Sequence, residues 1–129
     1  MSDEVSTDVL TQVANRRGLA RAFDAECARI GRDGAGALAI GLLDIDNFKR
    51  LNDSLGHAAG DSALKALAAT VRERLRPVDT VARFGGEAFV VLMPGADLRT
   101  AEAVAERLRA VTEEKLFALG AEPLRGTVS

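Results

Sequence analysis

The sequence predicts an α/β fold, and more narrowly a ferredoxin-like α/β sandwich with a central antiparallel-mixed sheet flanked by helices. Three observations lead to this prediction. Segments with the apolar spacing of helices alternate along the chain with short β-prone runs. A Gly-Gly pair separates two of those runs, as in a β-hairpin. The resulting order of strand, helix, hairpin and helix, with a further strand expected to begin at Thr127, is the ferredoxin-like order.

Three segments carry the apolar stripe of an amphipathic helix. They are residues 15–30, 61–75 and 98–115. Cys27 falls on the stripe of the first segment, so we expect it to be a buried small hydrophobe rather than a reactive thiol. Asp61 or Ser62 is expected to cap the second helix, and Asp97 the third.

The strand predictions come from apolar runs between these helices. Residues 37–45 form a nearly continuous apolar run, which favours a strand buried on both faces. Residues 80–84 and 89–93 are short β-prone runs on either side of Gly85-Gly86. We therefore expect one long strand followed later in the chain by a hairpin.

Composition excludes several classes of protein. With 17 basic and 19 acidic residues the formal charge is -2, so the chain lacks the basic surface of a domain that binds a nucleic-acid polymer. Its single cysteine cannot form an intramolecular disulfide or a cysteine-based metal site. No apolar run has the length of a membrane span, so we expect no direct membrane segment and a cytoplasmic setting.

Acidic residues follow two of the predicted strands. Asp44 and Asp46 alternate at the end of the first strand and so share one of its faces. A carboxylate at the open end of a strand suits a hard cation, although solvated acids or helix caps fit the same pattern. Gly85-Gly86 would let a polyphosphate approach the backbone, and Glu87 could share a metal with Asp44. A plain tight turn explains the two glycines equally well.

Residues 47–61 are dense in short polar side chains. Asn52 and Asp61 could read the edge of a base, because a carboxylate that accepts two N–H donors suits guanine. Turn and capping chemistry accounts for the same residue types. The spacing alone leaves both interpretations open.

Four stretches match known motifs in sequence order. They are residues 8–17, 44–61, 76–79 and 83–89. These look like the motifs D-x-L-T-G-L-x-N-R-R, D-x-D-x-F-K-x-x-N-D…G-H…G-D, R-x-x-D and R-[YF]-G-G-[DE]-E-F. Together they resemble the GGDEF domain, the diguanylate cyclase family. The chain departs from the pattern at Gln12, where Gly is usual, and at Ala88, where the signature has Glu.

The resemblance implies a nucleotidyl-cyclase-like fold and the condensation of two GTP molecules into cyclic di-GMP. Two domains meet face to face in this reaction, so it implies a homodimer, with guanine nucleotides as partners and Mg²⁺ as the cofactor. Asp44, the Ile45 carbonyl and Glu87 would bind the metal, and Glu87 and Asp44 would be the catalytic residues.

The resemblance also implies two sets of nucleotide contacts. The nucleotide-binding residues would be Phe48, Lys49, Asn52, Asp53, Asp61, Gly85 and Gly86. An inhibitory cyclic di-GMP site would contain Arg76, Asp79 and Arg83. A basic helix end followed by a cap-like acid is the alternative interpretation of Arg76 and Asp79.

Ala88 divides the functional hypotheses, because it removes a carboxylate near the expected metal. The favoured hypothesis is a domain that binds cyclic di-GMP or GTP with weak or absent cyclase activity. The alternatives are an active but impaired cyclase, and a dimerisation scaffold that has lost nucleotide binding. We expect residues 1–129 to be a single GGDEF domain, C-terminally shortened and lacking the family's last strand and helix.

Overall fold

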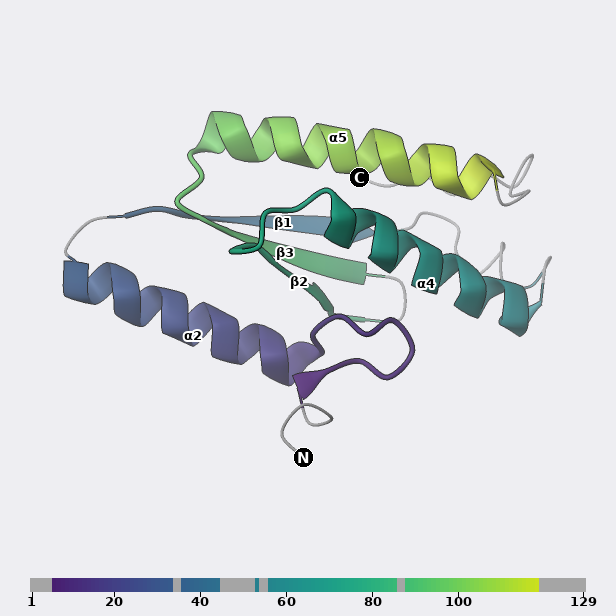
Figure 1. Ribbon diagram of the computed structural model, residues 1–129, viewed down its shortest axis with the longest axis horizontal. Helices are drawn as coiled ribbons and strands as arrows, with labels where there is room; N and C mark the ends of the chain where they lie inside the picture. Colours follow the sequence, from purple (N-terminus) through teal and green to yellow (C-terminus); the bar gives the residue numbers. More distant parts are fainter. Residues whose placement is uncertain (1–5, 34–35, 45–52, 54–55, 86–87, 119–129) are drawn as a thin grey trace.

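A computed structural model describes the chain at residues 6–33, 36–44, 53, 56–85 and 88–118. Its elements are α2 (Arg16–Asp33), β1 (Leu38–Asp44), α4 (His57–Glu73), β2 (Thr80–Arg83), β3 (Ala88–Pro94) and α5 (Leu98–Ala118). They form three layers, with α2 on one side of the sheet and α4 and α5 on the other (Figure 1). This arrangement confirms the predicted α/β class.

The described sheet has β3 in the middle, in the order β1-β3-β2. Both neighbours run antiparallel to β3, and the register pairs Leu43 with Phe89 and Val81 with Val91. A single parallel bridge between Ala14 and Ala82 extends the outer side of β2, so the pairing is antiparallel with one parallel addition. The strand expected from Thr127 onward lies outside the described residues.

The main core lies between the sheet and the pair α4 and α5, because alternate strand residues and one helical stripe meet there. Its largest buried members include Leu64, Leu67, Val71, Leu108, Leu43, Phe89, Val91 and Met93. The predicted stripe of α4 is confirmed, since its first three apolar positions are at most 2% exposed. This core fixes the ends of β1 and β3, where the acidic residues were predicted to act.

Two burial predictions are wrong on the opposite face. The first strand is not buried on both sides, because Ile40 and Leu42 are 58% and 59% exposed. Cys27 is exposed rather than buried. The reason is that α2 packs mainly against β2 and β3, and the described residues include no element that covers this part of α2 and β1.

The start of α4 also differs from the prediction. The helix begins at His57, so Asp61 lies inside it and cannot be its cap. Gly56 precedes the helix with φ 93°, a conformation that favours glycine, and no side chain caps the first turn. The cap of α5 is confirmed, because Asp97 Oδ1 accepts a hydrogen bond from the Thr100 N–H at 2.8 Å. None of the described helices is both long enough and apolar enough to span a membrane.

Candidate nucleotide site

The first of the predicted metal ligands is Asp44, the last residue of β1. Its side chain is exposed, and the register places it directly opposite Ala88, the first residue of β3. An exposed carboxylate is the oxygen donor that Mg²⁺ prefers. The other predicted ligands, Ile45 and Glu87, lie outside the described residues. Within the described ranges, no group of three or more His, Cys, Asp or Glu side chains could hold a metal ion.

The predicted guanine contacts are described only in part. Phe48, Lys49, Asn52 and Gly86 lie outside the described residues. Asp53 and Asp61 are both exposed, and Asp61 sits in the first turns of α4 away from its buried stripe. Its carboxylate makes no hydrogen bond or ion pair with the described part of the chain. The exposed residue Asp61 therefore has a carboxylate that no described residue occupies.

The start of the turn between β2 and β3 is held by backbone hydrogen bonds. The N–H groups of Phe84 and Gly85 both donate to the Ala88 carbonyl, at 2.8 and 3.3 Å. These bonds fix Gly85 beside the start of β3, next to the residue that faces Asp44. The signature segment therefore lies at the end of the sheet that also carries Asp44.

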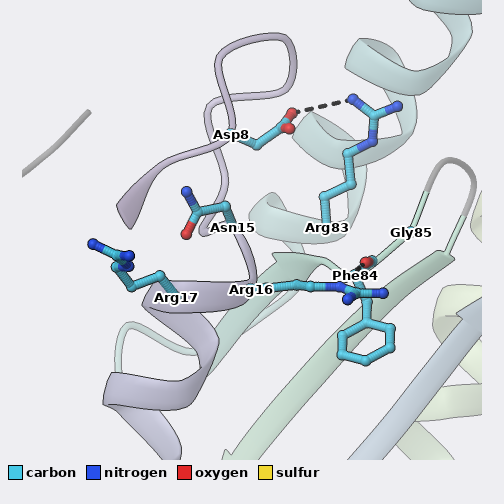
Figure 2. Close-up of a pocket in the computed structure, with 7 residues that line it drawn as sticks. All are labelled: Asp8, Asn15, Arg16, Arg17, Arg83, Phe84 and Gly85. Carbon is cyan, nitrogen blue, oxygen red and sulfur yellow. Dashed lines mark hydrogen bonds and ion pairs between the residues drawn. The ribbon is translucent and has the colours of Figure 1, made fainter. Parts of the chain in front are cut away.

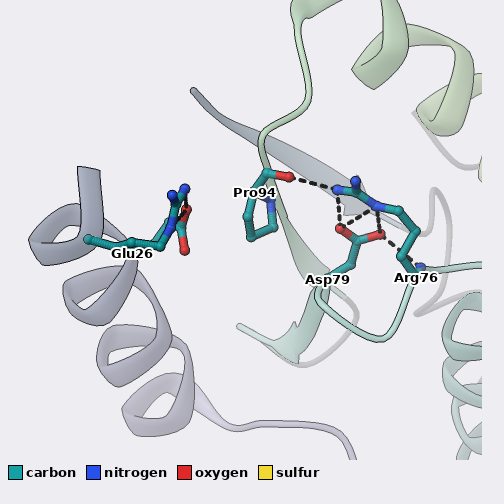
Figure 3. A network of polar contacts seen from close by, with 5 residues as sticks. Glu26, Arg76, Asp79 and Pro94 are labelled. Carbon is teal, nitrogen blue, oxygen red and sulfur yellow. Dashed lines mark hydrogen bonds and ion pairs between the residues drawn. The ribbon is translucent and has the colours of Figure 1, made fainter. Parts of the chain in front are cut away.

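The R-x-x-D residues form one compact ion pair after α4 (Figure 3). Arg76 Nη2 donates to Asp79 Oδ1 at 2.7 Å and to the Pro94 carbonyl at 2.8 Å. The Arg76 N–H also donates to Asp79 Oδ2 at 2.9 Å. The Asp79 side chain is 4% exposed, whereas that of Arg76 is 53% exposed. The hydrogen bond to Asp79 raises the pKa of the Arg76 guanidinium, which stays charged and accessible.

Arg83 does not join this pair. It lies at the other end of β2, four residues from Asp79 and so about 13 Å along the strand. Its Nη1 contacts Asp8 Oδ2 at 3.3 Å. The structure therefore places the three residues predicted for the inhibitory site in two separate locations.

Asp8 is the centre of a second polar cluster. Its Oδ2 accepts hydrogen bonds from the Thr11 N–H at 2.9 Å and the Thr11 hydroxyl at 2.6 Å. Burial alone would raise the pKa of this carboxyl, but the bonds from Thr11 and the charge of Arg83 outweigh it and lower the pKa. Asp8 is therefore an ionised anchor that links the N-terminal turn to the end of β2.

An open cavity of about 630 Å³ adjoins this cluster (Figure 2). Its lining residues are Asp8, Asn15, Arg16, Arg17, Arg83, Phe84 and Gly85. Sequence reasoning gave a binding role only to Arg83 and Gly85, and none to the other five. The signal that could have found them is the adjacent pair of arginines in the first motif.

Comparison with known families accounts for these motifs. The family model described as diguanylate cyclase, GGDEF domain, matches residues 5–129. The chain belongs to the GGDEF family. This confirms the resemblance seen in the four sequence motifs.

Curated GGDEF relatives cover nearly the whole chain. Diguanylate cyclase DgcP of Pseudomonas aeruginosa is 49% identical over 123 residues, which is 95% of this chain and 18% of the relative. The response regulator PleD of Caulobacter vibrioides is 39% identical over 127 residues, 95% of this chain and 27% of the relative. The chain therefore spans about a quarter or less of these relatives.

Solved GGDEF structures share the fold. The coiled coil and GGDEF domain of DgcB from Caulobacter crescentus, in complex with c-di-GMP, has a TM-score of 0.82 at 30% identity, over 88% of this chain and 59% of that one. Diguanylate cyclase SiaD from Pseudomonas aeruginosa, in complex with its activator SiaC, has a TM-score of 0.82 at 34% identity, over 99% of this chain and 49% of that one. The GGDEF fold of the chain is thus shown by both sequence and structure.

Proposed function

We propose that this chain is a cyclic di-GMP signalling domain that binds cyclic di-GMP or GTP and has weak or absent cyclase activity. The observation that carries the proposal is the Arg76–Asp79 pair. A nearly buried carboxylate holds an exposed guanidinium in a fixed orientation. Nε and Nη2 are used by Asp79 and the Pro94 carbonyl, which leaves the two N–H donors of Nη1 for phosphate oxygens or the acceptor edge of guanine. The solved relative DgcB, which is in complex with c-di-GMP, supports this choice of ligand.

A second nucleotide contact is proposed at the start of α4. The exposed carboxylate of Asp61 can accept the two N–H donors of guanine, with Asn52 as its predicted companion. Phe48, Lys49 and Asp53, together with Gly85 and Gly86 of the turn, would lie along the phosphates. We also infer that the domain works in the cytoplasm, and that its active arrangement is a homodimer with one nucleotide in each half.

Weak activity follows from the pairing of Asp44 with Ala88. Directly opposite side chains on antiparallel strands have Cβ atoms about 4.5–5.5 Å apart, so a glutamate at position 88 would stand beside Asp44. Alanine offers no oxygen there. When bound through Asp44, Ile45 and Glu87, Mg²⁺ would neutralise charge on the phosphates. Loss of a supporting ligand typically costs about 10–100-fold in activity or metal affinity.

An active but impaired cyclase is the second candidate, and Asp44 favours it. Its carboxylate remains exposed at the end of a rigid strand, where one metal ligand is needed. Product analysis after incubation with GTP and Mg²⁺ separates the two candidates. Cyclic di-GMP formed by the unmodified chain and abolished by Asp44→Asn would support the impaired cyclase, and its absence would support the binding domain.

Titration calorimetry with cyclic di-GMP tests the proposal. The unmodified chain should bind, and Arg76→Ala should weaken binding by about tenfold or more, because one charged hydrogen-bonding partner is lost. Arg74→Ala is the matched control, since Arg74 is an exposed arginine at the C-terminal cap of α4. Arg76→Lys keeps the positive charge but not the planar guanidinium, so its affinity for cyclic di-GMP should lie between those of Arg76→Ala and the control. If neither cyclic di-GMP nor GTP releases heat, the scaffold hypothesis replaces this proposal.

A further inference from the structure

The cavity beside the β2–β3 turn has an excess of positive charge. Among the described residues that line it, three side chains are arginines and one is an aspartate. Asp8 is matched by Arg83, which contacts it at 3.3 Å. Within the described lining, no further carboxylate is left to match Arg16 and Arg17. The cavity is thus built to receive negative charge from outside the chain.

Arg16 is held in place before any ligand arrives. Its Nε donates to the Phe84 carbonyl at 2.7 Å, and its guanidinium lies 4.3 Å from the centre of the Phe84 ring. A stacked guanidinium with its Nε bonded keeps a fixed plane, and its Nη groups still carry four N–H donors. Phe84 and Gly85 begin the signature turn, so this donor group is fixed beside that turn.

Arg17 is the complementary group on the other side of the cavity. Its side chain makes no hydrogen bond or ion pair with the part of the chain that the structure describes. Figure 2 shows its guanidinium pointing to a different side from that of Arg16. One small anion cannot satisfy both groups, so a ligand that contacts both must be extended. The volume, about 630 Å³, lies within the range of small-molecule sites.

We propose that this cavity binds an oligophosphate group, either free pyrophosphate or the phosphate tail of a nucleotide. Arg16 and Arg17 each contact one phosphate unit through paired hydrogen bonds. The site lies at the opposite end of β2 from the Arg76–Asp79 pair, so it is separate from the proposed cyclic di-GMP site. Gly85 belongs both to this cavity and to the proposed nucleotide contacts, so the nucleotide-tail form of the inference rests on the proposed function, whereas binding of free pyrophosphate does not.

Calorimetric titration of the full chain with inorganic pyrophosphate tests this site. Pyrophosphate should bind, and orthophosphate should bind at least about tenfold more weakly, because it can contact only one guanidinium. Arg17→Gln should weaken pyrophosphate binding by about tenfold or more and leave the fold intact, since Arg17 has no described partner. Arg21→Gln is the matched control. Arg21 lies one turn further along α2 and bonds to Ser6 Oγ at 3.0 Å, outside the cavity lining.

Further titrations identify the source of the phosphate. If pyrophosphate displaces GTP, and if GTP binds Arg17→Gln more weakly than it binds the unmodified chain, the cavity holds the phosphate tail of a nucleotide. Pyrophosphate binding with no effect on GTP would indicate the free anion. Absence of pyrophosphate binding, or equal weakening by Arg17→Gln and Arg21→Gln, would overturn the proposal. Cyclic di-GMP binding should be unchanged in Arg17→Gln, so failure here is distinct from failure of the proposed function.

Discussion

Replacing Ala88 with glutamate should create a magnesium-responsive pair with Asp44. The two residues are directly opposite in the β1–β3 register, and both lie at the end of the sheet that carries the signature turn. Their Cβ atoms should be about 4.5–5.5 Å apart on one face. The Asp44 side chain is exposed, so the introduced carboxylate can reach the same ion from the neighbouring strand.

The size of the effect follows from opposing contributions. Without metal, two carboxylates directly opposite each other should destabilise the fold by up to about 1 kcal/mol. At a free Mg²⁺ concentration about ten times the dissociation constant, binding to the folded state stabilises it by about 1.4 kcal/mol. In a domain of this length the Mg²⁺-dependent rise in Tm should be about 4–7 °C. The unmodified chain, with alanine at this position, should show a clearly smaller rise.

Thermal unfolding with and without Mg²⁺, at matched ionic strength, measures this difference. Ala88→Gln is the control for side-chain size, and Ala88→Glu combined with Asp44→Asn removes the partner. Both controls should lose most of the Mg²⁺-dependent rise. An equal rise in Ala88→Gln, or no rise in Ala88→Glu, would refute the placement of a metal between these two positions.

Three further predictions concern the N-terminal half of the chain. Asp8→Asn should destabilise the fold by about 1–2 kcal/mol near neutral pH, because bonds from Thr11 and the ion pair are weakened. The pKa of Asp8 is lowered, so its contribution is lost as pH falls through that pKa, and urea unfolding near pH 3 should show a smaller difference. Gln12→Gly should stabilise by up to about 1 kcal/mol in the same assay, since Gln12 has φ 65°; a loss of stability would contradict this. Gly18→Ala should destabilise the fold by about 1–3 kcal/mol, because the added Cβ would collide with the Ser6 carbonyl. Gly31→Ala is the control, because its Cβ meets nothing within 4 Å and should not destabilise the fold. An equal fall in Tm for the two variants would contradict the close approach of Gly18 to Ser6.

Local patterns in the sequence predicted most of the fold. The spacing of Leu64, Leu67 and Val71 marks the buried face of α4, and each of them is at most 2% exposed. Asp97 lies three residues before Thr100, and its side chain caps α5 by accepting a hydrogen bond from the Thr100 N–H. These features depend on neighbours within one helical turn, so the order of residues is enough to reveal them.

Burial on the other face of the sheet could not be predicted in the same way. Cys27 and Leu42 are apolar and have the correct spacing, yet both are exposed. Their burial depends on which element packs over them, and helical or strand periodicity contains no such information. The start of α4 was missed because Gly56 enters the helix without a side-chain cap, so the sequence offers no capping residue there.

The candidate site was predictable where its residues are close in sequence. Arg76 and Asp79 are three residues apart, and the structure joins them by a hydrogen bond that the sequence analysis did not predict. The family resemblance grouped Arg83 with them, and the structure shows that Arg83 contacts Asp8, 75 residues away in the sequence. The cavity proposed to bind an oligophosphate joins the start of α2 to the end of β2, and only the folded chain brings Arg83 next to the adjacent pair Arg16 and Arg17.

Assigned amide resonances, followed while cyclic di-GMP is added to the chain, show whether and where the domain binds this nucleotide. We predict saturable shifts at Arg76 and Asp79, with Gly95 moving as well because Arg76 bonds to the neighbouring Pro94 carbonyl. Arg76→Ala should remove this set of shifts. If no resonance moves as cyclic di-GMP is raised to millimolar concentration, and GTP is equally without effect, the chain is not a guanine-nucleotide domain and the account is contradicted.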